Sequence, residues 1–308
     1  MPIQNYPTVF DCTEMTAAVN KLPARPFFFK PLFEVKGVKT TTVSLDIRKG
    51  RIVLIGDSER NTAPESLAGR GAKREWKHLS CAHLAQMDTL APEDLQDVRA
   101  FGSTEPISVA AVYNDKMQQL KDNLAATMEF HRLGAIKGVV LDADGTTVLH
   151  DIFNTFGATK KTLDISFPKT AADDANPILT SILKAKRHVE AAMGGTPFDH
   201  IECIIGSDAY DMLTSHKLVR EYFERWLSNR ENFGNNDYRK RGFPYGGLTF
   251  VERSDVVGGQ TMVAAKKGHV YPVGPGIFKQ YHAPADWMET VNTICLLYTS
   301  DAADDSLR

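Results

Sequence analysis

A long run of apolar residues at helical spacing constrains this chain more than any other feature. Between residues 107 and 133, apolar side chains recur every three or four residues, which is typical of one face of an α-helix. They are Val109, Tyr113, Met117, Leu120, Leu124 and Met128. At about 1.5 Å per residue this segment predicts a rod of roughly 40 Å, which is long for a small domain. Pro106 suits its first turn, Ser103 or Thr104 could cap it, and Gly134 is expected to end it.

A β-hairpin is expected directly after this helix. Two apolar runs, 138–141 and 146–149, flank the pair Asp144 and Gly145, and Asp-Gly between such runs is a strong hairpin signal. The sequence therefore predicts a central element in which a long helix lies on a β-hairpin.

Another hairpin is expected near the N-terminus, followed by a long loop. The β-branched runs 43–47 and 51–56 are separated by three residues that end in Gly50, which can adopt a positive φ. Residues 57–77 are polar and lack apolar periodicity, so they predict a long, mildly basic, projecting loop.

A further αβ unit is predicted downstream of a polar stretch at 171–176. It comprises a helix at 178–193 closed by Gly194 and Gly195, a buried strand at 201–205, one or two helices at 207–226, a loop at 228–247, and short strands at 248–251, 261–265 and 268–271.

The first forty residues contain five prolines and predict an extended arm. The arm carries a dense apolar cluster, made of Phe27, Phe28, Phe29, Leu32 and Phe33. Such a cluster needs a cover, and either a neighbouring subunit or the chain's own domain could supply it.

Charge and cysteine usage exclude several classes of protein. The net charge of −2 argues against a protein whose main partner is the phosphate backbone. The four cysteines are widely spaced without a C-x-x-C pair, so we expect reduced thiols in a cytoplasmic setting. No signal peptide and no apolar run of about 18 residues is present, so a soluble protein is expected.

The C-terminal residues 295–308 do not continue the preceding segment. Their sequence resembles the translated product of a sequencing-library adapter, so we expect a non-native tail and a longer natural chain. A strand begun at 290–293 would then lack its continuation.

One motif favours an enzyme. The segment 139–147 resembles the first motif of haloacid-dehalogenase-type phosphatases, with Asp142 as nucleophile and Asp144 as acid or base. Ser207, after an apolar strand, could serve as the second motif. The downstream G-D-x-x-x-D acidic pair is missing, and turn geometry alone explains Asp-Gly between two apolar runs.

Two further patterns resemble a nucleic-acid-binding surface and a metal site. Arginines and aromatic residues alternate between Arg220 and Phe243, as in single-strand-binding modules, although acidic residues cancel much of the charge. His78, Cys81 and His83 have a loosely metal-like spacing, but no fourth ligand is near, and we expect no metal site.

Eight segments, taken in order along the chain, resemble the lambda-like major capsid protein E family of tailed phages. They are 16–23, 37–43, 98–102, 129–138, 141–145, 243–247, 281–286 and 289–293. Each is weak alone, and their common order carries the resemblance.

The resemblance implies an α+β chain with the Hong Kong 97-type phage capsid fold. It divides the chain into an N-terminal arm (1–42), an extended β-hairpin loop (43–90), a peripheral domain (91–170) with a long spine helix (107–133), an axial domain (171–272), a return to the peripheral domain (273–294) and the tail (295–308).

The implied function is that of a major capsid protein of a tailed phage or prophage. Copies of the chain would form pentamers and hexamers of an icosahedral shell, assembled in the host cytoplasm and located in the virion. Scaffold, portal and decoration proteins are expected partners, and the shell would enclose double-stranded DNA without binding it specifically. No catalytic residue, cofactor, metal or membrane contact is expected.

Overall fold

The computed structural model describes residues 28–49, 73–91, 108–168, 176–228, 239 and 242–284. Helices and strands are mixed along this α+β chain. The predicted arm before residue 28, the prolines and caps proposed at 103–106 and the tail at 295–308 lie outside these residues, as do residues 51–56 and Phe27.

Helix α2 (Val109–Lys137) is the predicted long helix, shifted toward the C-terminus. Ser108 caps it by accepting a hydrogen bond from the Ala111 amide at 3.2 Å, so the cap predicted at Ser103 or Thr104 is wrong. The predicted end at Gly134 is also wrong, because the helix continues to Gly138, which takes φ 88°. Gly134 instead allows close packing, since an added Cβ would lie 2.9 Å from the Val139 carbonyl oxygen.

The hairpin after the helix is confirmed. Strands β4 (Val139–Leu141) and β5 (Val148–Asp151) pair antiparallel with a bulge. Gly145, at φ 71°, donates its amide to the Asp142 carbonyl at 2.9 Å and closes the turn. The short helix α3 (Ile152–Phe156) follows, capped by Asp151.

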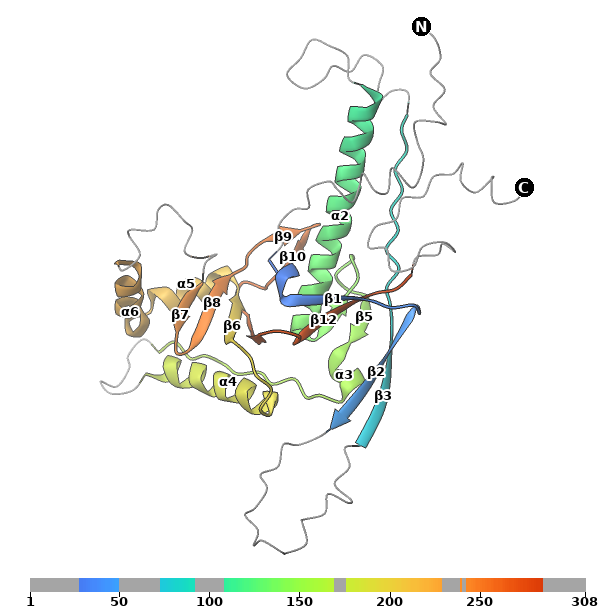
Figure 1. The fold of residues 1–308 in the computed structure, drawn as a ribbon. Helices are drawn as coiled ribbons and strands as arrows, with labels where there is room; N and C mark the ends of the chain where they lie inside the picture. The colour runs from blue at the N-terminus through green and yellow to red at the C-terminus, as the bar shows by residue number, and fades with distance from the viewer. Residues whose placement is uncertain are drawn as a thin grey trace, which may run out of the picture.

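The N-terminal hairpin is longer than predicted. Strand β2 (Thr42–Lys49) pairs with β3 (Lys73–Ser80), from Thr42 opposite Ser80 to Lys49 opposite Lys73. The predicted pairing of 43–47 with 51–56 is therefore wrong, and the predicted loop at 57–77 overlaps a strand at its end. A two-stranded hairpin leaves much of both faces in solvent, so β3 can form from a polar sequence without apolar periodicity. Figure 1 shows β2 and β3 projecting away from the body, opposite to the N-terminal half of α2.

The second unit is built on a four-stranded sheet in the order β11-β6-β8-β7. Its strands are β6 (His200–Ile205), β7 (Phe243–Tyr245), β8 (Leu248–Glu252) and β11 (Gly268–Val273). Only β6 and β8 are parallel. The helices described in this unit are α4 (Pro177–Met193), α5 (Ser207–Ser215) and α6 (Lys217–Ser228). The predicted helices and the strands at 201–205, 248–251 and 268–271 are confirmed.

Two predictions for this unit need correction. The loop predicted at 228–247 contains β7, which a turn at Gly246 (φ 61°) and Gly247 (φ 79°) joins to β8. The strand predicted at 261–265 is mostly loop: β9 (Val256–Val257) pairs with β10 (Gln260–Thr261), and Met262 and Val263 leave the sheet to be buried in a core.

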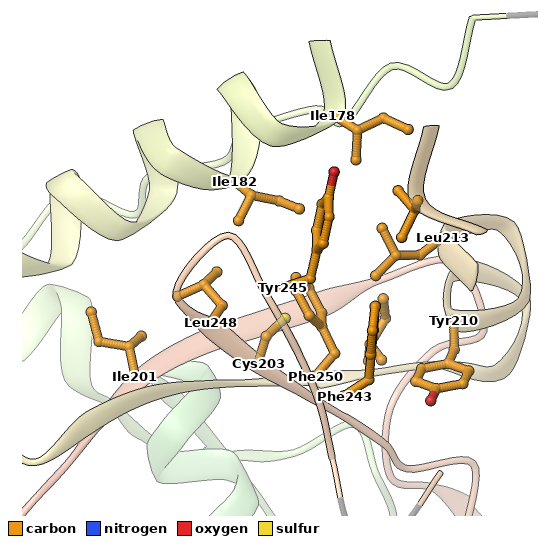
Figure 2. Close-up of a cluster of buried hydrophobic side chains, with 12 residues drawn as sticks. Ile178, Ile182, Ile201, Cys203, Tyr210, Leu213, Phe243, Tyr245, Leu248 and Phe250 are labelled. Atoms are coloured by element: carbon orange, nitrogen blue, oxygen red, sulfur yellow. The ribbon is translucent and has the colours of Figure 1, made fainter. Parts of the chain in front are cut away.

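Alternate residues of β6 enter different cores. One core lies between the sheet and helices α4, α5 and α6, and Ile201, Cys203 and Ile205 point into it. Figure 2 shows Ile178 and Ile182 of α4 above the strand residues of this core. The other core takes Ile204 together with Leu133 of α2 and Phe29 and Phe33 from the N-terminal segment.

The N-terminal segment thus packs on its own chain. After the turn η2 (Lys30–Leu32), strand β1 (Phe33–Gly37) pairs in parallel with β12 (Phe278–His282). Phe29 is 2% exposed. Of the two covers considered for the apolar cluster, the chain's own domain is confirmed for Phe28, Phe29, Leu32 and Phe33.

Candidate functional site

Three distant parts of the chain meet in a buried polar network on α2, which we call the joint. Glu129, 3% exposed, accepts a hydrogen bond from the Phe29 amide at 2.6 Å. Arg132, 6% exposed, donates to the other Glu129 oxygen at 3.1 Å and to Gln280 Oε1 at 2.8 Å. The joint therefore fixes the N-terminal segment and β12 to the same helix face.

The charges and hydrogen-bonding groups of the joint are paired with one another. A buried carboxylate is stable only when it is paired and hydrogen-bonded, and Glu129 is satisfied by one cation and one backbone amide. Gln280 Nε2 lies 2.9 Å from His282 Nε2. Burial, and then the nearby Arg132 charge, lower the pKa of His282, so the imidazole stays neutral beside the guanidinium.

Aromatic contacts hold the N-terminal segment against the sheet unit. The Phe33 and Phe278 rings lie 5.2 Å apart across the parallel β1–β12 pair. The Arg253 guanidinium stacks 3.9 Å from the centre of the Phe28 ring, a cation–π contact from the end of β8. Helix, segment and sheet are thus locked together by both polar and apolar contacts.

The β2–β3 hairpin is a different kind of surface. Near its base Val43 is buried, and the Ser44 hydroxyl lies 2.9 Å from His78 Nδ1. Farther along, Trp76 is 59% exposed, and Met87 in the following extended segment is 87% exposed. Of these two side chains Trp76 lies on the ribbon itself, where a second protein could cover it.

The phosphatase residues are not arranged as a catalytic site. Asp144 uses its carboxylate within the turn, accepting hydrogen bonds from the amides and hydroxyls of Thr146 and Thr147 at 2.6–2.9 Å. These bonds lower the pKa of Asp144, the Thr147 hydroxyl contributing most. Asp142 follows β4, whereas Ser207 follows β6 in a different sheet. The turn geometry accounts for both aspartates.

Two aromatic residues of the arginine-rich segment, Phe223 and Trp226, pack against the core, whereas Tyr222 is 48% exposed and the aromatic residues at 233 and 238 lie outside the described residues. Phe223 and Trp226 pack edge-on against Phe243, with ring centroids 4.9 and 5.5 Å away. Arg220 is paired with Glu224 at 2.7 Å on the same helix. The Phe223 and Trp226 rings therefore belong to the core between sheet and helices, not to a stacking platform for bases.

The residues of the metal-like spacing, His78, Cys81 and His83, do not form a metal site together. His78 contacts Ser44, and burial raises the pKa of the Cys81 thiol. Within the described ranges, no group of three or more His, Cys, Asp or Glu side chains could hold a metal ion. Cys81 and Cys203 are both free, and burial raises the pKa of Cys203 to about 12.

The sequence matches a known protein family over almost its whole length. The family model described as phage major capsid protein E matches residues 11–306. The chain belongs to this capsid protein family. The resemblance found in the sequence is thereby confirmed, and the chain functions as a phage major capsid protein, a structural subunit of the virion that assembles into the capsid.

Two relatives of this capsid protein carry the same description. The major capsid protein of Pseudomonas phage KPP10 is 26% identical over 315 residues, covering 95% of this chain and 88% of that protein. The major capsid protein of Salmonella phage Felix O1 (isolate Felix O1-VT1) is 23% identical over 220 residues, covering 70% of this chain and 58% of that protein. None of the helices in the described part of the chain is long and apolar enough to cross a membrane.

The joint was missed in the sequence, although one signal pointed to it. The apolar positions Leu120, Leu124 and Met128 would be continued at 131 or 132, where a histidine and an arginine stand instead. A charged residue on the apolar face of a long helix indicates a buried partner. The partners lie 100 and 148 residues away, which periodicity alone does not reveal.

Proposed function

We propose that this capsid protein adopts the Hong Kong 97-type fold and forms pentamers and hexamers of an icosahedral shell. In this proposal residues 1–42 are the arm, 43–90 the extended loop, 91–170 the peripheral domain with the spine helix, 171–272 the axial domain and 273–294 the return segment.

The arrangement of elements supports this division. Helix α2 has 29 residues, about 43 Å at 1.5 Å per residue, and it separates the long hairpin from the sheet unit along the chain. The parallel pairing of β1 with β12 lays residues 278–282 beside the N-terminal segment, next to α2, as a return of the chain requires.

The observation that carries the assembly proposal is the projecting β2–β3 hairpin. A two-stranded ribbon is marginally stable alone, and among the described strands nothing pairs with the outer edges of this one. This one also carries exposed Trp76. A neighbouring copy would cover the side chain and brace the ribbon, so each hairpin would become an intersubunit contact in a closed shell.

The remaining expectations follow from a shell-building role. Scaffold, portal and decoration proteins are the proposed partners besides further copies of the chain, and double-stranded DNA is enclosed without specific recognition. Assembly takes place in the host cytoplasm. The chain catalyses no reaction and needs no cofactor, and the use of Asp144 within a turn supports this.

Deletion of part of the hairpin tests the proposal. Replacing residues 46–76 by a short flexible linker removes Trp76 and the outer half of both strands, and it keeps the base of the ribbon, where Val43 is buried. We expect the variant to remain folded by circular dichroism but to form no shells by electron microscopy, whereas the full chain forms them. Normal shells from the deletion variant, or no shells from the full chain, would contradict the proposal.

A further inference from the structure

Basic side chains gather where the last turn of α2 meets the sheet unit. Lys137, the last residue of α2, donates its ammonium group to the Met262 carbonyl. The loop that starts at Met262 carries Lys266 and Lys267 and leads into His269 on β11. The helix end and this loop therefore bring basic groups together from two separate parts of the chain.

The electrostatic state of these groups supports their proximity. Burial, followed by the Lys267 charge, lowers the pKa of Lys137. Burial, followed by the charges of Lys137, Lys160 and Lys267, lowers the pKa of His269 to about 4. In the described ranges, none of these three lysines forms an ion pair with a carboxylate. Within the described ranges the charges of these lysines are thus not neutralised by an ion pair, and the carboxylate that belongs to the pocket turn, that of Asp144, is bonded to Thr146 and Thr147.

A pocket of about 160 Å³ opens beside this basic group. Lys137, Gln260 and Thr261 supply its polar lining, and Phe130 and Leu133 of α2 supply apolar walls. Gly145 also lines it, and a Cβ there would lie 2.4 Å from Gln260 Oε1. The turn that contains Gly145 therefore packs directly against the Gln260 side chain of β10.

The polar lining has donors to spare. An ammonium group has three N–H donors, and Met262 uses one of those on Lys137. The Gln260 amide donates to the Asp144 backbone carbonyl at 3.3 Å, which leaves its second N–H. The Asp144 carboxylate is occupied by Thr146 and Thr147. An anion in the pocket could therefore accept from Lys137, Gln260 and the Thr261 hydroxyl.

We propose that this pocket, lined by Lys137, Gln260 and Thr261 and close to Lys267, binds a phosphate group. Phosphate carries up to two charges and accepts hydrogen bonds on several oxygens, which suits several converging donors and cations better than a single carboxylate does. Its volume is roughly that of two waters of about 30 Å³ each, so it fits the pocket. The phosphate is either a free ion or part of a nucleic-acid backbone.

Two binding measurements distinguish these sources. The purified full chain is titrated with inorganic phosphate by calorimetry in phosphate-free buffer, and separately with a short double-stranded DNA at several salt concentrations. Lys137→Gln removes the lining charge, and Lys267→Gln removes an exposed charge close to the pocket without disturbing the core. Lys184→Gln on α4 is the matched control, because Lys184 is also exposed but lies outside the basic group.

We expect Lys137→Gln to weaken binding about tenfold or more, the effect of losing one charge-assisted hydrogen bond. Lys267→Gln should weaken it about threefold, and Lys184→Gln should change it less than about twofold, as expected for charges at increasing distance. Binding of inorganic phosphate with this pattern assigns a free anion. Binding of DNA alone, with the same pattern and a salt slope smaller by about one in Lys267→Gln, assigns the backbone phosphate.

Three results would overturn the inference. Wild-type protein could bind neither ligand, or Lys137→Gln and Lys267→Gln could bind as tightly as the Lys184→Gln control. Alternatively, poly-glutamate could bind as tightly as the phosphate ligand and with the same dependence on Lys137 and Lys267, which would assign the basic group to an acidic protein partner. Because Lys267 is exposed, its variant keeps the test decisive if Lys137→Gln fails to fold.

Discussion

Glu129 connects helix α2 to a part of the chain that is distant in sequence. Its two carboxylate oxygens are used by the Phe29 amide and by Arg132, and Arg132 continues the network to Gln280. The Glu129–Arg132 pair on α2 therefore bonds both the N-terminal segment and β12, in addition to the direct pairing of β1 with β12.

The first prediction concerns this residue. Glu129→Gln would leave Arg132 buried without a counter-charge, and breaking a buried pair in this way costs about 3–5 kcal/mol of unfolding free energy. Chemical denaturation of the folded subunit measures the loss. Glu190→Gln, which removes a half-exposed partner of Lys186, is the control and should cost less than about 1 kcal/mol. Equal losses of unfolding free energy in the two variants would show that the buried pair stabilises the fold no more than an exposed pair does.

His269 gives a prediction about pH. Its folded-state pKa is about 4, below the usual value, because of burial and then the nearby lysines. As the pH falls below about 6.5, His269 becomes protonated in the unfolded chain but stays neutral in the folded chain. The free energy of unfolding therefore decreases as the pH falls from about 6.5 to about 4.

The expected size of this loss is about 1–2 kcal/mol after allowance for solvent screening of the partly exposed ring. Thermal unfolding at pH 7 and pH 5, in buffer without phosphate, measures it. His131 and His282 also have lowered pKa values, so the wild-type protein and the His269→Gln variant should both lose stability on acidification. The loss should be smaller in His269→Gln, and an identical loss would refute the assignment to His269.

At the scale of single elements, the two glycines that end α2 and α4 separate backbone strain from crowding. Gly138 and Gly194 both take left-handed conformations, with φ 88° and φ 56°. A Cβ on Gly138 would lie 2.2 Å from the Phe153 ring, whereas a Cβ on Gly194 would meet nothing within 4 Å.

We therefore predict that Gly138→Ala is the more costly substitution. Gly194→Ala should lose about 1 kcal/mol for the left-handed backbone, and Gly138→Ala about 3 kcal/mol, because Phe153 must also move. Equilibrium unfolding of both variants tests the difference. Similar losses would mean that α3 can shift away from the helix end without cost.

The same elements show what the sequence could and could not predict. Apolar periodicity located α2, α4 and the sheet strands, because packing of a periodic face determines them locally. It failed at Gly134, where close packing against β4 overrides a common stop signal, and at β3, whose partner lies beyond residues 50–72. The buried joint and the proposed phosphate pocket depend on contacts between residues 100 and 125 positions apart, which no local pattern contains.

At the scale of the whole molecule, the chain combines one well-packed body with one projecting ribbon. The sheet unit, α2 and the N-terminal segment share two cores through alternate residues of β6. The β2–β3 hairpin pairs only with itself among the described strands. Stability should therefore be unevenly distributed, with the hairpin at its low end.

Hydrogen exchange tests this distribution and its link to assembly. In the free subunit we expect the amides of β2 and β3 to exchange at least about a hundredfold faster than those of β6, because an isolated ribbon opens without disrupting a core. In assembled shells, burial of Trp76 and of the ribbon edges against a neighbour should slow exchange in β2 and β3 by a similar factor. The amides of β6, central in its sheet, should remain protected in both states and serve as the internal reference. Hairpin exchange that is equally fast in subunits and shells would mean that the ribbon is not an intersubunit contact, and the exposed Trp76 would then need a partner other than another copy of the chain.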